Sequence, residues 1–232
     1  MMILPSSLQT TNKRLQMSIC VARRQPCVFS QEEWLTAPYL QTAPSTADKL
    51  LNLLIQIPGL LARLDTVNSS PNNQFLEGEK VAIETETHTF LIELDHHWDS
   101  IISESNGTDP HTLLIQEPTN SSSPIDSTIP IAVSHFRCAK TLCLYILTCF
   151  YPRYEQDLTS FCSESLDLAE MLQAAEEINP SWPRMVSLLQ IIIFSTPFHA
   201  DERRACGILE GWAKTTGFLG IAMNGKIGAV GW

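Results

Sequence analysis

The chain has 232 residues, which suits one domain with tails, and its hydrophobic fraction of 44% is ordinary for a globular protein and too high for a disordered one. Its 15 basic and 25 acidic residues give a formal net charge of -10, which argues against nucleic-acid binding through a broad basic surface. The first residues lack the apolar core of a signal peptide, no stretch reaches the roughly 20 apolar residues of a membrane span, and the seven cysteines are expected to be reduced thiols of an intracellular protein.

The chain opens with a polar lead-in, residues 1–22, which shows no sustained period and is expected to be a flexible tail. A compact block follows at residues 24–39. Ser30 is predicted to cap a short helical turn in this block, because Glu33 at the third helical position would complete a capping box. Two aromatic residues are expected to pack on the domain and to pin the block to it. These are Trp34 and Tyr39.

Two short helices and a long one are predicted next. Ser45 is a suitable N-cap for the first, and Pro58-Gly59 separates the leucine-rich first helix from the second. Residues 74–103 carry apolar residues three and four apart, which indicates an amphipathic helix with an acidic wet side. Its expected apolar face consists of Phe90, Leu91, Leu94, Trp98, Ile101 and Ile102. A serine- and proline-rich stretch, about 106–130, is interpreted as a loop insertion within one domain.

The apolar centre of the chain lies in residues 131–151 and 182–198. Both runs are apolar around most of their circumference, which is typical of buried helices. An amphipathic helix is predicted between them, at residues 156–177, and Asp201 is predicted to cap a last helix.

These patterns predict the fold class, because no period-two strand pattern and no internal repeat is visible. We expect an all-α fold, a single irregular bundle of about seven helices over residues 23–222, followed by a C-terminal tail at 223–232. Trp98 and Trp212 are expected to anchor the outer helices. Replacing a buried tryptophan by alanine should cost about 3–5 kcal/mol.

Two groups of residues imitate a ligand site. Gly220 and Gly225-Lys226 have the spacing of a phosphate-binding loop, but Ile227 stands where the metal-binding Ser or Thr would be, so a nucleotide site is not predicted. A cluster on the predicted long helix offers metal ligands three or four residues apart, but no second cluster completes the shell. We interpret it as a solvated helix face. Its members are Glu93, Asp95, His96, His97 and Asp99.

Cysteines and histidines are the other candidates. Three cysteines of the central helix lie five and six residues apart, which does not place them on one face, so they are interpreted as buried small hydrophobes. These are Cys138, Cys143 and Cys149. Cys20 and Cys27 lack the further ligands of a zinc site, and no nucleophile pairs by sequence with His135 or His199. The sequence therefore predicts no catalytic, cofactor-binding or metal-binding residue, no cofactor and no enzymatic activity.

The block at residues 24–39 also carries a resemblance to a known family. The features that carry it are Arg24, Pro26-Cys27, a hydrophobic pair, Ser30, an acidic residue before Trp34, Pro38-Tyr39, and a leucine-rich helix ending in Ile57-Pro58-Gly59-Leu60-Leu61. This order resembles the regulatory region of fungus-specific transcription factors of the binuclear zinc-cluster class, over roughly residues 20–220. The resemblance implies a helical regulatory domain of the kind linked to secondary-metabolite gene clusters.

The DNA-reading module of that family, with six cysteines, two Cys-x2-Cys pairs and a basic run, has no counterpart in this sequence. The resemblance therefore implies nuclear regulation without direct DNA contact. The chain would act through a protein partner, either a DNA-binding transcription factor or a co-regulator, and could also form a homodimer. The absence of the DNA-reading module is also expected of a truncated relative of the family or of a gene product that lacks an upstream exon. For the location, the cytoplasm is the alternative to the nucleus. The alternative function is a small accessory protein or enzyme of a biosynthetic cluster, which would hold an apolar substrate in a cavity lined by polar groups such as His135 or His199.

Overall fold

The computed structural model of this protein describes residues 6–39, 43–69, 76–105, 109–110, 124–174 and 182–216. These residues form helices and turns without a strand, which confirms the predicted all-α class. There are 8 helices of nine or more residues in this part of the chain. They are α1 (Ser6–Arg23), α3 (Thr46–Leu54), α4 (Ile57–Ser69), α5 (Glu77–Glu104), α7 (Pro124–Thr148), α8 (Glu155–Ala174), α9 (Trp182–Ser195) and α10 (His199–Thr216). A short helix, α2 (Glu32–Thr36), and 3-10 turns at Val28–Ser30, Ala37–Tyr39 and Pro152–Tyr154 complete the described elements.

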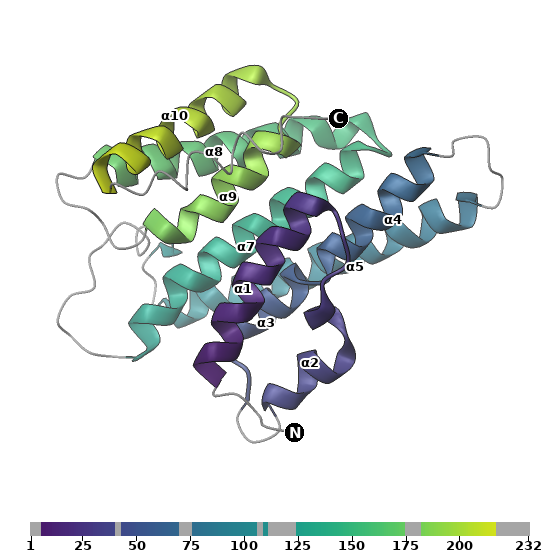
Figure 1. Cartoon of the computed structure of the whole chain (residues 1–232), viewed down its shortest axis with the longest axis horizontal. Helices are drawn as coiled ribbons and strands as arrows, with labels where there is room; N and C mark the ends of the chain where they lie inside the picture. The colour runs from purple at the N-terminus through teal and green to yellow at the C-terminus, as the bar shows by residue number, and fades with distance from the viewer. Residues whose placement is uncertain are drawn as a thin grey trace.

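Helix α7 is the centre of the bundle (Figure 1), with α8, α9 and α10 on one side and α3, α4 and α5 on the other. Its residues 132–139 are all buried, which confirms the prediction of a helix buried around its circumference. It begins at Pro124, however, so the predicted loop insertion ends earlier than residue 130, and Pro130 lies inside the helix. Proline removes one backbone hydrogen bond from the helix at this point, where Ile129 and Val133 are buried.

Helix α1 corrects the prediction of a flexible tail, which is wrong for residues 6–23. Lys13, Met17 and Val21 follow one another at intervals of four and are each 2–3% exposed, so they form a narrow buried stripe along one side of the helix. The stripe packs against α3 and α4, and the Ser18 hydroxyl lies 3.2 Å from the Ser187 hydroxyl of α9. Of its three described members, only Met17 and Val21 are apolar, so the stripe is too sparse to give a hydrophobic period in the sequence.

The block after α1 is attached to the bundle by the predicted Tyr39, whose ring lies against the Lys13 ammonium of α1, and by two residues that were not predicted. Phe29 and Leu35 pack against the core, whereas Trp34 packs edge-on against Phe29, with ring centroids 5.2 Å apart. The cap also differs, because Gln31 is the N-cap of α2 and the Ser30 hydroxyl donates to the Cys27 carbonyl at 2.7 Å. The block is therefore attached through Phe29 and Leu35 and through contacts of its backbone and of Tyr39 with Lys13.

The remaining elements follow the predicted order. Ser45 and Asp48 form the reciprocal hydrogen bonds of a capping box at the start of α3, as its N-cap role requires. Helix α5 matches the predicted long amphipathic helix. Asp201 does not cap α10, which begins at His199 and has Asp201 in its first turn. Residues 111–123 of the loop insertion and the C-terminal tail at 223–232 lie outside the described residues.

Among the residues that the structure describes, one helical stretch, Thr46–Ser69, is long and apolar enough to cross a membrane by length and composition. It comprises α3 and α4, and 61% of its most apolar window is buried inside the structure. Leu50, Leu54 and Leu61 within it are 0% exposed, so the apolar residues of this stretch pack against other helices.

Candidate functional site

The acidic and histidine cluster of α5 is spread over the outside of the helix. Asp95 accepts a hydrogen bond from Lys140 Nζ at 2.9 Å, and the rings of His96 and His97 lie 5.8 Å apart. Burial lowers the pKa of His97, and the nearby charges of Lys49 and His96 lower it further. In the part of the chain that the structure describes, no group of three or more His, Cys, Asp or Glu side chains could hold a metal ion.

The surroundings of the cysteines in the central helix do not favour a reactive thiolate. Cys138 and Cys143 are fully buried, whereas Cys149 is exposed at the end of α7. Burial raises the pKa of Cys138 to about 12 and raises that of Cys143 as well. Burial and the neighbouring Cys27 thiol also raise the pKa of Cys20 to about 11. Because the thiolate is the nucleophile and the metal ligand, none of these shifts favours a reactive cysteine.

The two candidate histidines lie in different environments. His135 is buried, and its Nδ1 lies 3.1 Å from the Ala47 carbonyl, so it links α7 to α3. His199 is 93% exposed at the start of α10 and pairs with Glu202 at 3.1 Å. A side chain so exposed cannot line a buried substrate site together with His135. Gly220 and Gly225-Lys226 lie outside the described residues.

A buried lysine is a feature that the sequence interpretation missed. Lys13 donates from Nζ to the Trp34 carbonyl at 2.9 Å and to Asn52 Oδ1 at 3.1 Å, and the same ammonium lies 5.6 Å from the centroid of the Tyr39 ring. Burial lowers the pKa of Lys13, against the opposing charge of Asp48. A shifted lysine can mark a catalytic site, but these contacts occupy the ammonium within the protein. Lys13 therefore ties α1 to α2 and α3.

Arg24 makes a second tie at the end of α1. It has a φ of 49°, and the backbone bonds from Arg24 to the Val21 carbonyl and from Gln25 to the Cys20 carbonyl form a Schellman motif, where glycine is the usual residue. The arginine side chain reaches Asp65 of α4 through two hydrogen bonds of 2.6 Å. It also donates to the Tyr145 hydroxyl of α7 at 3.3 Å. This bidentate contact offsets the backbone strain of the left-handed position.

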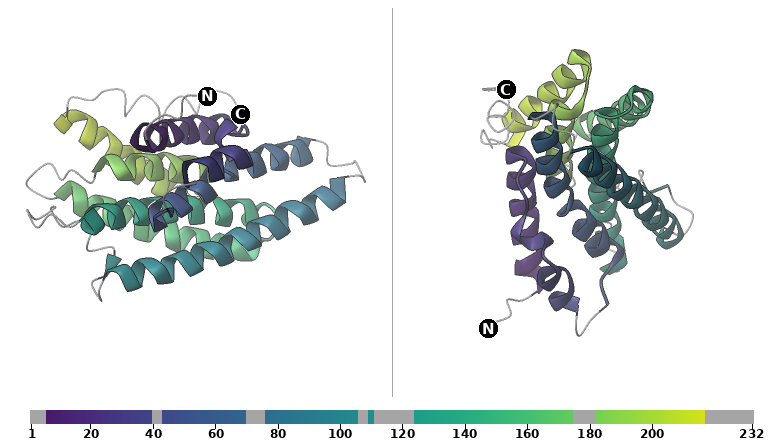
Figure 2. Two further views of the ribbon diagram at one scale, coloured as in Figure 1. Left: turned by 90° about the horizontal axis from the view of Figure 1, so that it is seen from below. Right: turned by 90° about the vertical axis from the view of Figure 1, so that its right-hand side faces the viewer.

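The outer face of α5 carries three of the exposed large hydrophobic residues in the described part of the chain. We define it by seven residues that share one side of the helix: Val81, Thr85, His88, Ile92, Asp95, Asp99 and Ile102. Three of them are apolar and exposed, Val81 to 60%, Ile92 to 72% and Ile102 to 45%. The exposure of Ile102 corrects its predicted place on the buried face. Figure 2 shows that α5 lies at the outside of the bundle, on the side opposite α1.

The charge of α5 adds to this surface. The helix contains eight Asp or Glu residues and one lysine, Lys80. Single exposed hydrophobic residues are normal on protein surfaces, but an apolar and acidic pattern along one long helix is a surface on which another protein can pack. The sequence contained a signal for it, because Ile92 is two residues from Leu94 and so cannot share its buried side.

No family model matches the chain, and neither a curated protein nor a solved structure matches it. The class of protein is therefore defined by the fold, an all-α bundle. Within its described residues, the buried Lys13, His135 and Arg137 each join one helix to another, and α5 presents the apolar and acidic outer face.

Proposed function

We propose that this protein is a non-catalytic transcription regulator that acts by binding another protein through the outer face of α5. The observation that carries the proposal is the exposure of Val81, Ile92 and Ile102 along one side of the long acidic helix. The resemblance of residues 24–61 to the regulatory region of zinc-cluster transcription factors supports the transcriptional role. It also supports control of a secondary-metabolite gene cluster as the target.

The buried polar groups support a binding role over a catalytic one. Arg137 is 3% exposed and donates to the Ser165 hydroxyl at 2.7 Å, which joins α7 to α8. Its guanidinium also stacks on the Phe161 ring, 5.1 Å from the centroid. Lys13, Arg24 and His135 make similar contacts between helices. These groups stabilise the bundle, and a partner can then bind to a rigid surface.

The first test is the transcriptome of a strain that lacks the gene. We expect a contiguous set of genes to fall silent and wild-type protein to restore their transcripts. An Ile92→Lys variant should accumulate normally but fail to restore them. Met171→Lys is the matched control, because Met171 is an apolar residue of α8 that is 57% exposed, and it should restore transcription.

The opposite result is equally informative. If all transcripts are unchanged while a metabolite disappears or an intermediate accumulates, the protein acts in a biosynthetic step and the proposal is wrong. If both variants restore transcription fully, regulation does not use the outer face of α5.

A further inference from the structure

We propose that the outer face of α5 binds a positively charged amphipathic helix of a partner protein. The inference rests on the proposed function for the existence of a protein partner, and it adds the chemistry by which that partner is recognised. It is argued from the spacing, the burial and the charge of residues on α5.

The spacing of the outer face is that of a helix-packing seam. Its seven residues follow one another at intervals of four and three, which is the repeat by which two helices pack side by side. At about 100° per residue, Ile92 lies about 20° around the helix from Val81. The seam from Val81 to Ile102 is about 32 Å long at 1.5 Å per residue, which suits a partner helix of about six turns.

The other side of α5 is already filled. Ile83, Thr87, Leu94 and Ile101 are each 0% exposed and face the bundle. Trp98 lies beside this buried side, stacked on Phe136 of α7 with ring centroids 4.4 Å apart. Helix α5 is therefore fixed by one face, and docking of a partner on the outer face needs no rearrangement of the core.

The charge of the surface selects the kind of helix. Two seam residues, Asp95 and Asp99, are acidic, whereas Glu79, Glu86 and Glu93 lie about 120–160° around the helix from Val81, between the seam and the buried side. Arg63 pairs with Glu79 and Glu86, Lys140 pairs with Asp95, and Lys80 pairs with Glu77. The three cations carry fewer charges than the eight carboxylates of α5, so the surface keeps a net negative charge.

Charge complementarity then decides between occupants. A second copy of this chain would bring two acidic seams together, and like charges across an interface are repulsive. A helix with lysine or arginine beside an apolar stripe can cover Val81, Ile92 and Ile102 while its cations meet Asp95 and Asp99. The long aliphatic stems of these cations would cover further apolar surface.

The test uses the full chain and synthetic peptides of about 21 residues, the length of the seam. One peptide is built from leucine and lysine with the leucines at helix-seam spacing, a second has the same composition in scrambled order, and a third carries glutamate in place of lysine. Binding is measured by fluorescence anisotropy at physiological salt. We expect the first peptide to bind at least about tenfold tighter than either of the others.

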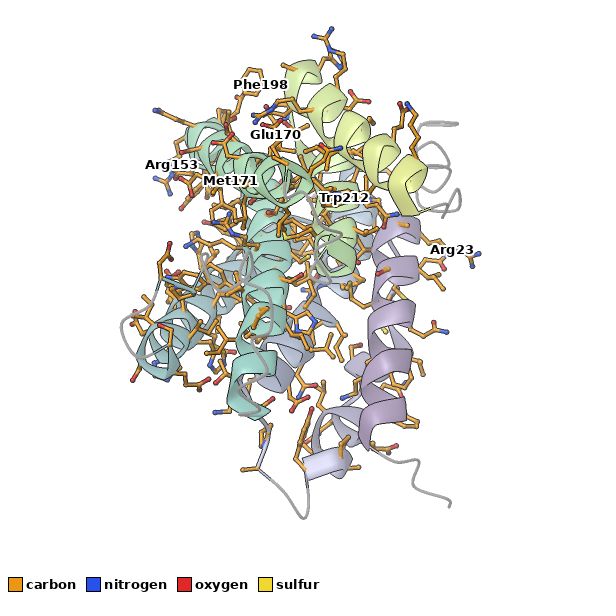
Figure 3. The ribbon with its side chains drawn as sticks, turned by 90° about the vertical axis from the view of Figure 1, so that its left-hand side faces the viewer. Arg23, Arg153, Glu170, Met171, Phe198 and Trp212 are labelled. Carbon is orange, nitrogen blue, oxygen red and sulfur yellow. The ribbon has the colours of Figure 1, made fainter. Side chains whose placement is uncertain are left out.

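Two variants locate the binding. Ile92→Ser and Asp99→Lys should each weaken the first peptide about tenfold, and Asp99→Lys should improve binding of the glutamate peptide. Met171→Ser is the control, since Met171 lies on the surface of α8 (Figure 3), and it should leave affinity unchanged. Circular dichroism checks that all three variants remain folded.

Three results would overturn the inference. Equal affinity for the scrambled peptide would mean attraction by charge alone, a loss in Met171→Ser would place the binding elsewhere, and a dimer that Ile92→Ser dissociates would make a second copy the occupant. The outcome is separate from that of the proposed function. Peptide binding with unchanged transcripts would leave the surface intact and remove the transcriptional role, whereas silent genes without peptide binding would do the reverse.

Discussion

Helices α1 and α5 cover opposite sides of the bundle and are attached to it in different ways (Figure 2). Helix α5 is held by an apolar stripe that includes Ile83, Leu94 and Ile101, each 0% exposed. In α1 the described buried stripe is short, and the contacts that fix its position are polar, from Lys13 to Asn52 and from Arg24 to Asp65. The difference shows that an outer helix can be fixed either by apolar area or by a few directed hydrogen bonds.

The two modes of attachment have different consequences for the surface. An apolar stripe tolerates variation on the opposite side, so the outer face of α5 is open to a binding function. Directed bonds depend on both partners, because a charge left alone in a partly buried site loses its compensation. We therefore expect α1 to be sensitive to single polar substitutions and α5 to be sensitive to truncation of its buried side chains.

The largest effect is expected on α5. Leu94→Ala should lower the free energy of unfolding by about 3 kcal/mol, because it leaves a cavity against α7. Ile92→Ala, two residues away and 72% exposed, should change it by less than about 0.5 kcal/mol. Denaturant unfolding of both variants measures the difference. Similar losses in the two variants would contradict the assignment of buried and outer faces.

A smaller effect is expected at the tie between α1 and α4. Asp65→Asn keeps the shape of the side chain but removes the charge that meets Arg24, and it should cost about 2 kcal/mol. The same change in α5, Asp99→Asn, should cost less than about 0.5 kcal/mol, because Asp99 is exposed. Amide hydrogen exchange should speed up first in α1 of the Asp65→Asn variant. Unchanged exchange there would show that α1 does not depend on this pair.

The smallest change in the free energy of unfolding, counted for each residue, is expected at alkaline pH. It arises from buried thiols in the core against which both helices pack. Burial raises the pKa of Cys138 and of Cys162 to about 12 from 9.0, so both thiols stay protonated in the folded protein after they have ionised in the unfolded chain. Their contribution is complete below pH 9 and is lost as pH rises from 9 towards 12. The loss is about 1 kcal/mol for each thiol at pH 10.

The measurement is the unfolding midpoint between pH 8 and pH 10. Lys13 acts in the opposite sense, because its lowered pKa makes the folded state gain stability as pH approaches 10.5. Two thiols act against one lysine, so we expect the unfolding midpoint to fall as the pH rises and α1 and α5 to unfold together. A constant midpoint, or exchange that begins in α1 alone, would show that the thiols do not control alkaline unfolding.

Much of the fold could be predicted from sequence where hydrophobic residues are dense. The period of α5, the capping box at Ser45 and the apolar run of α7 are local signals, and the structure confirms all three elements. The tail prediction failed at α1, since its buried stripe includes a lysine. The candidate surface was only partly predictable, because the acidic side of α5 was expected but the exposure of Ile102 was not.

The sequence by itself determined the helical class and the approximate position of most helices, because periodicity and capping depend on residues close together in the chain. Only the tertiary structure decided which cations are buried and that Ile102 of α5 stays exposed. Lys13 and Asn52 are 39 positions apart, and Arg24 and Tyr145 are 121 apart. Such contacts exist only after packing has brought distant helices together, so no local pattern in the sequence encodes them.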